Sequence, residues 1–507
     1  MTGTGDEEVA SALRAAEPTP DAGQDRVAGL ARRVGRAGFL LTSRQLVVAI
    51  LSAVATAAVA RVLGVAVFGQ YAAAMGTVTL LLALCDLGFS LVLGRELAMS
   101  ENHKGQLLRT AVRAETIWSA VVAVVVLGIA FGLGVRTTRG EILLIMIPVV
   151  VLSGYSAYRQ IFLVMFDVGF LAKVDIASNV LTNGAMIGVA LLAHSAVAIA
   201  VAYSTGTVGA ILVVASVGNR RLERRQAQPM ADVWSLARRA FPFGVNSIIA
   251  SAYFTIDLVL IQFLVSPRPL GNYAAACKFL SIVVTVPGLI LSAALPALAM
   301  LAQNRADSSA LTARLTHWLA VTALPLNVGL CIFARTAVHI AFGASYSEAV
   351  PLVRILAGAG AVGCLLNPLG MATVSLALNR QQMFANAIAL GFNVSANLVL
   401  VPIAGVIASA WLTLATDALA GGITVFILRE RMLLRPVVAV LGRPLAASAA
   451  LAGVGVALAS SPALAMIVSA AVYIVTLTVM RGWPIEFSAR AASQWRKWRS
   501  RQVGAVG

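Results

Sequence analysis

The chain is a succession of about fourteen apolar runs, each of roughly twenty residues, separated by short loops. A run of that length is typical of a helix that crosses the hydrocarbon core of a bilayer. With 59% hydrophobic and 12% charged residues, the 507-residue chain has more apolar side chains than one soluble core can bury. The sequence therefore predicts an all-α polytopic membrane protein with about 14 transmembrane helices.

One short motif occurs twice in the chain. The sequence FGQYAAA at residues 68–74 returns as LGNYAAA at residues 270–276, an offset of 202 residues. The two copies open the second and the eighth apolar run, so both helices are expected to cross the membrane in the same direction. We therefore expect two parallel-repeat six-helix bundles around a central cavity, followed by two additional C-terminal helices.

The first apolar run, Phe39 to Leu63, is too long for the hydrophobic region of a signal peptide, which favours a retained helix over a cleaved leader.

The expected organisation has six parts. The parts are a disordered cytoplasmic tail at 1–37, an N-terminal six-helix bundle at 38–218, a basic cytoplasmic linker at 219–240, a C-terminal six-helix bundle at 241–428, two additional helices at 429–482, and a basic interfacial tail at 483–507.

Basic residues outnumber acidic ones by 38 to 21, and their distribution predicts the orientation. With the N-terminus inside, 31 of the basic residues fall in inward segments and six in outward ones. Cytoplasmic loops of membrane proteins carry such an excess. We therefore expect a multi-pass protein of the cytoplasmic (inner) membrane with both termini cytoplasmic, and anionic lipids rather than nucleic acid as the partners of the basic loops.

Several short motifs, taken in order, support a family resemblance. They are Arg61-Val-Leu-Gly64, Asp86-Leu-Gly88 and Gly94-Arg95-Glu96-Leu97-Ala98 in the first half, and Phe241-Pro242, Phe342-Gly343 and Asn397-Leu-Val-Leu-Val-Pro402 in the second. From about Phe39 to Leu428 the chain resembles the polysaccharide-biosynthesis flippases, which are O-antigen-type lipid-linked oligosaccharide translocases of the multidrug/oligosaccharidyl-lipid/polysaccharide exporter superfamily.

The resemblance implies a function and a substrate. A protein of this kind would move a glycan linked to a polyprenyl pyrophosphate from the cytoplasmic to the outer leaflet by alternating access, for synthesis of cell-surface polysaccharide. The resemblance also implies a glycan polymerase or glycosyltransferase as a protein partner. It does not identify the glycan, because such families keep their topology better than their cavity residues.

Two charges near the middle of predicted spans are candidate substrate-binding residues. Asp257 and Lys278 each lie about eight residues, or roughly 12 Å, from the predicted outer interface. Their equal depth on consecutive helices makes a contact feasible. Lys278 could attract the pyrophosphate while Asp257 holds or releases it; alternatively, the two residues form a static buried pair that fixes helix packing.

Two further charges lie near the predicted inner surface. Arg44 is about one turn inside the first span, and its guanidinium suits bidentate contacts with phosphate. A pyrophosphate that comes from the inner leaflet would meet Arg44 first. Asp86 lies near the inner end of the second span. The alternative is that Arg44 snorkels to the lipid headgroups with Asp86 as its partner.

Amide and proline residues complete the set of candidates. Asn179 and Asn246 could line a cavity that accepts sugars, although hydrogen bonding between helices explains such amides equally well. Pro287, Pro296 and Pro325 remove backbone hydrogen bonds within spans, so they are candidate hinges for inward-to-outward switching, or static kinks.

Other functions remain possible from the sequence. A multidrug or cation antiporter and a lipid II flippase of the same superfamily are the alternatives within transport. A membrane glycosyltransferase or ligase would need larger polar outward loops than this chain has. The sequence contains no nucleotide-binding glycine loop, metal cluster or catalytic triad, and its four cysteines are interpreted as packing residues. We therefore expect a non-enzymatic transporter with neither a cofactor nor a metal.

Overall fold

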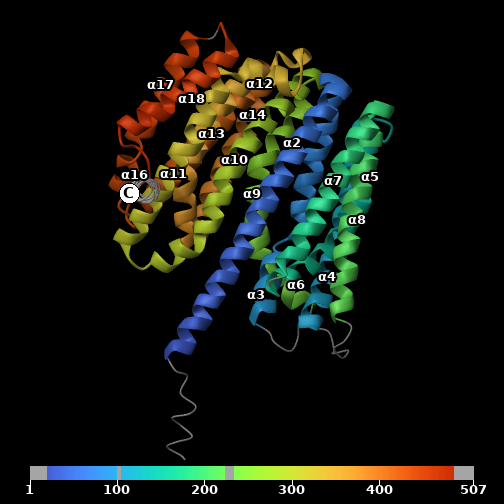
Figure 1. Ribbon diagram of the computed structural model, residues 1–507. Coiled ribbons are helices and arrows are strands. Elements are labelled where there is room, and N and C mark those ends of the chain that lie inside the picture. The colour runs from blue at the N-terminus through green and yellow to red at the C-terminus, as the bar shows by residue number, and fades with distance from the viewer. Residues whose placement is uncertain (1–19, 100–103, 166, 223–232, 459, 485–507) are drawn as a thin grey trace, which may run out of the picture.

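The computed structural model describes residues 20–99, 104–165, 167–222, 233–458 and 460–484 (Figure 1). In these ranges the chain is helical and contains no strand. The helices are α2 (Pro20–Asp86), α3 (Phe89–Met99), α4 (Lys104–Leu133), α5 (Thr138–Leu152), η1 (Ser153–Ala157), α6 (Tyr158–Val164), α7 (Val168–Ala193), α8 (Ala196–Leu222), α9 (Val233–Leu264), α10 (Pro267–Leu301), α11 (Arg305–Ile332), α12 (Ala334–Ala341), η2 (Ala344–Tyr346), α13 (Ala349–Ser375), α14 (Asn379–Ala404), α15 (Val406–Leu428), α16 (Arg435–Ala439), α17 (Gly442–Ala457) and α18 (Pro462–Val479).

The number of membrane crossings agrees with the sequence. Twelve helical segments in the described ranges are long and apolar enough to span a bilayer. One of them, Arg44–Asp86, contains two crossings, because the backbone of α2 leaves helical geometry at Gly64, where φ is 72°. The 35-residue helix α10 is also long enough to cross a bilayer. The predicted all-α polytopic fold is confirmed.

The predicted ends of the chain need one correction. Helix α2 begins at Pro20, so the disordered tail expected at 1–37 is wrong for residues 20–37. Residues 1–19 and the interfacial segment expected at 485–507 lie outside the described residues. In the predicted linker, α8 continues to Leu222 and α9 begins at Val233, so the connection between the helices is shorter than expected. We call the end of the bundle near this connection the inner end and the opposite end the outer end.

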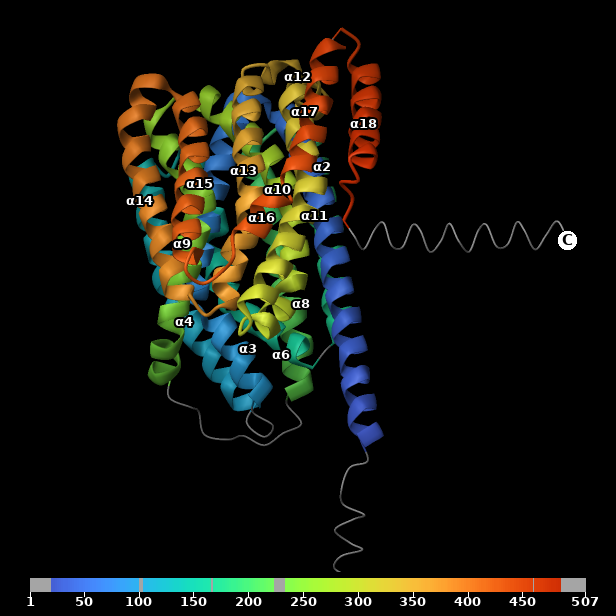
Figure 2. The same ribbon diagram turned by 90° about the vertical axis from the view of Figure 1, so that its left-hand side faces the viewer.

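Helix α2 contacts helices from both halves of the chain. It packs against α10 on one side and α7 on the other, and it also contacts α9 (Figure 1). The last two spans, α17 and α18, lie at the edge of the bundle, where α17 packs on α11 (Figure 2).

The two copies of the repeated motif lie against each other at the outer end. A Cβ atom on Gly69 would come within 2.6 Å of the Gly271 backbone nitrogen, and one on Gly271 would overlap the Val65 carbonyl oxygen. Tyr71 and Tyr273, two residues after each glycine, are buried. Close packing therefore explains the glycine in each copy of the motif, because only glycine permits this backbone approach.

We expect Gly271→Ala to destabilise the folded protein. The added methyl would meet backbone atoms that cannot move aside, and overpacking of this kind costs about 1–3 kcal/mol. Thermal unfolding in detergent should show a lower midpoint and a lower yield of monodisperse protein. Gly288→Ala is the matched control on the same helix, because nothing lies within 4 Å of its added Cβ. Equal midpoints for the two variants would contradict the close contact.

The candidate hinge prolines lie within continuous helices. Helix α10 runs through Pro287 and Pro296, and α11 runs through Pro325. The hinge role of these prolines stays a prediction. The clearest interruption of a span is elsewhere, in the fourth crossing, where the 3₁₀ segment η1 separates α5 from α6.

Candidate functional site

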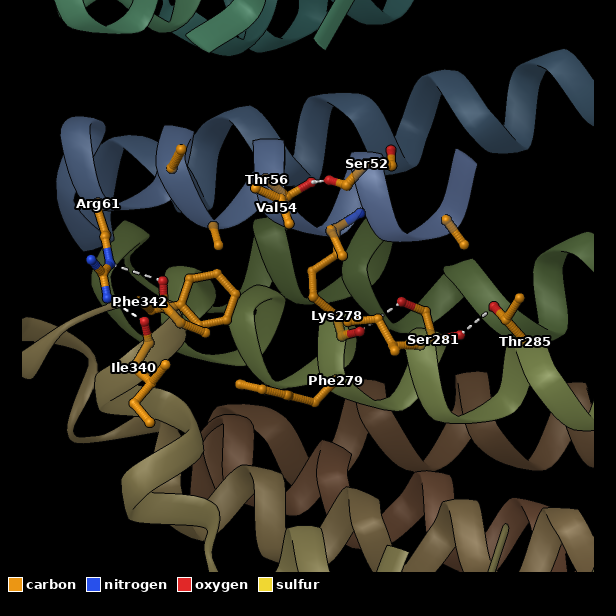
Figure 3. A pocket seen from close by; sticks show the side chains of 16 residues that line it. Ser52, Val54, Thr56, Arg61, Lys278, Phe279, Ser281, Thr285, Ile340 and Phe342 are labelled. Atoms are coloured by element: carbon orange, nitrogen blue, oxygen red, sulfur yellow. Dashed lines mark hydrogen bonds between the residues drawn. The ribbon is translucent and has the colours of Figure 1, made fainter. Parts of the chain in front are cut away.

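A cavity of about 610 Å³ lies between α2 and α10 (Figure 3). We call it the lysine cavity. Alanine, valine, isoleucine and phenylalanine side chains form much of its lining, together with serine and threonine hydroxyls and two cations. The cations and hydroxyls include Ser52, Thr56 and Arg61 of α2, and Lys278, Ser281 and Thr285 of α10. Helix α12 and Phe342 border the same cavity beside Arg61.

Lys278 extends from α10 toward α2, and its side chain is exposed in the cavity (Figure 3). Within the described part of the chain, no carboxylate lies within ion-pair distance of its ammonium group. A lysine in the middle of a transmembrane helix costs about 2.5–3.5 kcal/mol on insertion scales. An uncompensated cation at this depth is therefore suited to binding an anion that enters the cavity.

The contact between Lys278 and Asp257 that equal depth made feasible is not formed in the structure. Asp257 is a hydrogen-bond acceptor for the Tyr273 hydroxyl at 3.1 Å, the Thr413 hydroxyl at 2.9 Å and the Asn397 amide at 3.3 Å. The reason is helical rotation: Lys278 comes five residues after Tyr273, which places it about 140° around α10 from the face that meets Asp257. The two charges have equal depth but lie on different sides of the helix.

The outer end of the lysine cavity is closed by polar contacts between α2 and the α12–η2 segment. The Arg61 Nε donates to the Ala341 carbonyl at 2.9 Å, and its Nη2 donates to the carbonyls of His339, at 3.2 Å, and Ile340. These carbonyls end α12, where a cation is favourable. We call this set of contacts, together with those of Tyr346 described next, the outer latch.

Tyr346 completes the outer latch. Its hydroxyl donates to the Ala60 carbonyl at 2.8 Å, and burial raises its pKa above the ordinary value, so it stays protonated and able to donate. The rings of Phe68, Phe342 and Tyr346 pack together beside it, with centroids 5.4–6.2 Å apart. The outer side of the cavity is therefore held shut by hydrogen bonds and aromatic packing.

Arg44 does not pair with Asp86, the partner that the snorkelling alternative gave it. Its Nη1 pairs with the Asp175 carboxylate of α7, not with Asp86. Arg159 of α6 binds the same carboxylate through two parallel hydrogen bonds, of 2.9 and 2.6 Å. Asp86 instead accepts a hydrogen bond from the Ser90 backbone N–H at 3.1 Å, and this bond caps the start of α3. Two guanidinium groups around one carboxylate leave a net positive charge near the inner end.

The two candidate amides have different positions. Asn179 of α7 lines a second cavity, and its amide donates to the Asp175 carbonyl at 2.9 Å. Asn246 of α9 is exposed and lies outside the lining of both cavities. Asp257 also lies outside both linings. The structure therefore brings Lys278 to one cavity and Asn179 to the other, while Asp86, Asp257 and Asn246 lie elsewhere.

Arg159 and Asp175 line the amide-rich second cavity and pair with each other, although the sequence alone marks them mainly as signals of orientation. Their positions near the inner ends of the fourth and fifth crossings made that interpretation natural. Acidic residues contribute little to orientation. An aspartate in an inward segment was therefore the available signal of a partner for Arg44 and Arg159.

Comparison with known proteins identifies relatives of this chain. The sequence model of a family described as "Polysaccharide biosynthesis protein" matches residues 34–302. The teichuronic acid biosynthesis protein TuaB of Bacillus subtilis (strain 168) is 27% identical over 225 residues, which cover 42% of this chain and 44% of TuaB. The matched region thus spans less than half the length of that curated relative.

A flippase and a multidrug-type transporter are among the solved structures with a similar fold. The lipid II flippase MurJ in an inward closed conformation superposes with a TM-score of 0.67 and 11% identity, over 87% of this chain and 98% of MurJ. The eukaryotic MATE transporter AtDTX14 gives a TM-score of 0.59 and 12% identity, over 82% of this chain and all of that one. At such identities these similarities show the fold alone.

Proposed function

The chain belongs to the polysaccharide biosynthesis protein family, and on this basis we propose that it is a flippase for a lipid-linked glycan. The substrate is an oligosaccharide or polysaccharide precursor on a polyprenyl pyrophosphate. The protein moves it from the inner to the outer leaflet of the cytoplasmic membrane by alternating access. The transporter fold supports this proposal, and so does the teichuronic acid biosynthesis named for the relative TuaB.

One observation carries the proposal. Lys278 places an unneutralised ammonium in a cavity within the membrane-spanning part of α2 and α10. A pyrophosphate is the anionic part of a polyprenyl-linked substrate, and the surrounding apolar side chains strengthen its attraction to the lysine by excluding water. The same lysine would repel the organic cation that an antiporter carries, so it favours the flippase over the antiporter.

The closed outer latch suggests the order of the transport steps. With the outer side shut, a substrate reaches Lys278 from the inner leaflet, passing the arginines around Asp175. Outward release then requires the latch to open. An inside-negative potential favours outward movement of the pyrophosphate by about 2.3 kcal/mol per net charge per 100 mV. The candidate hinges Pro287, Pro296 and Pro325 belong to this switching step.

The proposal is tested by the leaflet distribution of lipid-linked glycan in cells depleted of the protein. We expect the intermediate to accumulate in the inner leaflet and to clear when the wild-type chain is expressed again. A change in drug sensitivity with a normal distribution of the intermediate would instead favour the antiporter. Accumulation of lipid II alone would favour the lipid II flippase.

A further inference from the structure

A second cavity, of about 280 Å³, adjoins the lysine cavity. We call it the amide cavity. Its lining comes from α2, η1, α6, α7 and α8, and Ser52 of α2 belongs to the linings of both cavities. Both cavities therefore border the turn of α2 that carries Ser52, and a ligand that occupies both would pass this turn.

The fourth crossing lines one side of the amide cavity and changes its helical geometry there. The helix changes to 3₁₀ geometry at η1, which presents Tyr155 and Ser156 to the cavity. Close packing against the Thr116 backbone holds the interrupted segment in place, because a Cβ on Gly154 would come within 2.6 Å of the Thr116 backbone nitrogen. Interrupted helices inside a membrane protein occur where they line a cavity, and a mid-helix 3₁₀ stretch often marks a functional position.

The lining of the amide cavity is rich in directional hydrogen-bonding groups. Asn179 and Asn183 both use their amide nitrogen to bind a carbonyl one turn back, at 2.9 and 2.8 Å. Their side-chain oxygens accept no hydrogen bond from the described residues, so they remain available to a ligand. Arg159 adds charged donors at the inner side of the cavity, and Tyr155 and Tyr203 add aromatic rings.

This lining differs from that of the lysine cavity in the chemistry that it can recognise. A sugar presents hydroxyl groups, which donate and accept hydrogen bonds, and an apolar ring face, which packs on aromatic side chains. A pyrophosphate presents only acceptors and needs cations. The amide cavity offers acceptor oxygens, donors and rings together, and its only cation in the lining, Arg159, is already paired with Asp175.

We propose that the amide cavity binds the sugar closest to the pyrophosphate while Lys278 binds the pyrophosphate itself. The inference rests on the proposed flippase function and adds a substrate class for a second site. Its volume, near the lower end for ligand pockets, suits a mono- or disaccharide, so the rest of the glycan must lie outside. The amide cavity then selects the glycan, and the lysine cavity selects the lipid pyrophosphate.

The test compares two ligands on the full-length protein in lipid nanodiscs. The first is the lipid-linked glycan extracted from cells depleted of this protein, and the second is polyprenyl pyrophosphate without sugar. We expect the double variant Asn179→Ala and Asn183→Ala to weaken binding of the first ligand about tenfold, because two acceptors are lost. Binding of the sugar-free ligand should stay within about twofold of wild type, which also shows that the variant is folded.

Two controls separate this inference from the proposed function. Asn367→Ala removes an amide of α13 outside both linings and should bind both ligands as wild type does. Lys278→Met should weaken binding of both ligands. The sugar site is overturned if the double variant binds the glycan ligand normally, or if it loses both ligands equally, which would make the amide cavity a phosphate site. Wild-type protein that binds neither ligand would overturn the flippase function as well.

Discussion

Replacement of Lys278 by methionine is expected to stop glycan export while leaving the protein folded. The variant keeps the length and apolar stem of the side chain but removes the ammonium that faces the lysine cavity. Losing a charged partner for a desolvated anion typically costs 2–5 kcal/mol, so transport should fall at least about thirtyfold. The measurement is the rate at which reconstituted vesicles move polyprenyl pyrophosphate between leaflets.

Stability should change in the opposite direction from transport. Methionine avoids the cost of a lysine within the membrane, so the thermal midpoint of Lys278→Met should equal or exceed that of the wild type. Lys278→Arg keeps the charge and should retain part of the activity. Lys173→Met is the matched control, because Lys173 is an exposed residue of α7 that lies in neither lining. If Lys278→Met transports normally, the lysine has only a structural role and the pyrophosphate site is lost.

Removal of the Arg61 guanidinium is expected to open the outer side of the protein. Arg61→Ala deletes the contacts with the carbonyls of His339, Ile340 and Ala341, while the hydrogen bond from Tyr346 to Ala60 remains. Hydrogen bonds that involve a charged group contribute about 1.5–3 kcal/mol each. Loss of even one of them shifts the equilibrium between closed and open states about tenfold toward the open state.

Distances between spin labels on the two sides of the latch measure this shift. Labels at Ala66→Cys, two residues after the interruption of α2 at Gly64, and at Ser345→Cys in η2 occupy exposed positions at the outer end of the bundle. In the Arg61→Ala background, a longer distance should become more populated. Arg354→Ala, which removes an exposed arginine of α13, is the control and should leave the distribution unchanged. An unchanged distribution in Arg61→Ala would mean that the aromatic packing and the Tyr346 hydrogen bond keep the outer side closed without Arg61.

Some of the candidate site was predictable from local sequence and some was not. Lys278 stood out because a lysine inside an apolar run is costly wherever the helix packs. Its supposed partner Asp257 was chosen from depth alone, and depth does not fix which side of a helix a residue faces. Arg44 was recognised as an unusual charge, but its partner Asp175 is 131 residues away and was not identified.

The repeated glycine motif was likewise predictable only in part. Its repetition at an offset of 202 residues indicated related crossings, but not that Gly69 and Gly271 contact each other at the outer end. The change to 3₁₀ geometry at η1 also had no clear signal, because Ser153 to Ala157 contains no proline and its one glycine reads as an ordinary small residue in a membrane helix.

The sequence by itself determined that the chain crosses a membrane many times as helices. Every backbone polar group in the hydrocarbon core must be paired, and apolar runs of this length meet that requirement only as helices. Only the tertiary structure decided which charges share a cavity. The rotation of α10 separates Lys278 from Asp257, and the packing of α2 against α7 joins Arg44 to Asp175, because both depend on contacts between distant segments that no local pattern records.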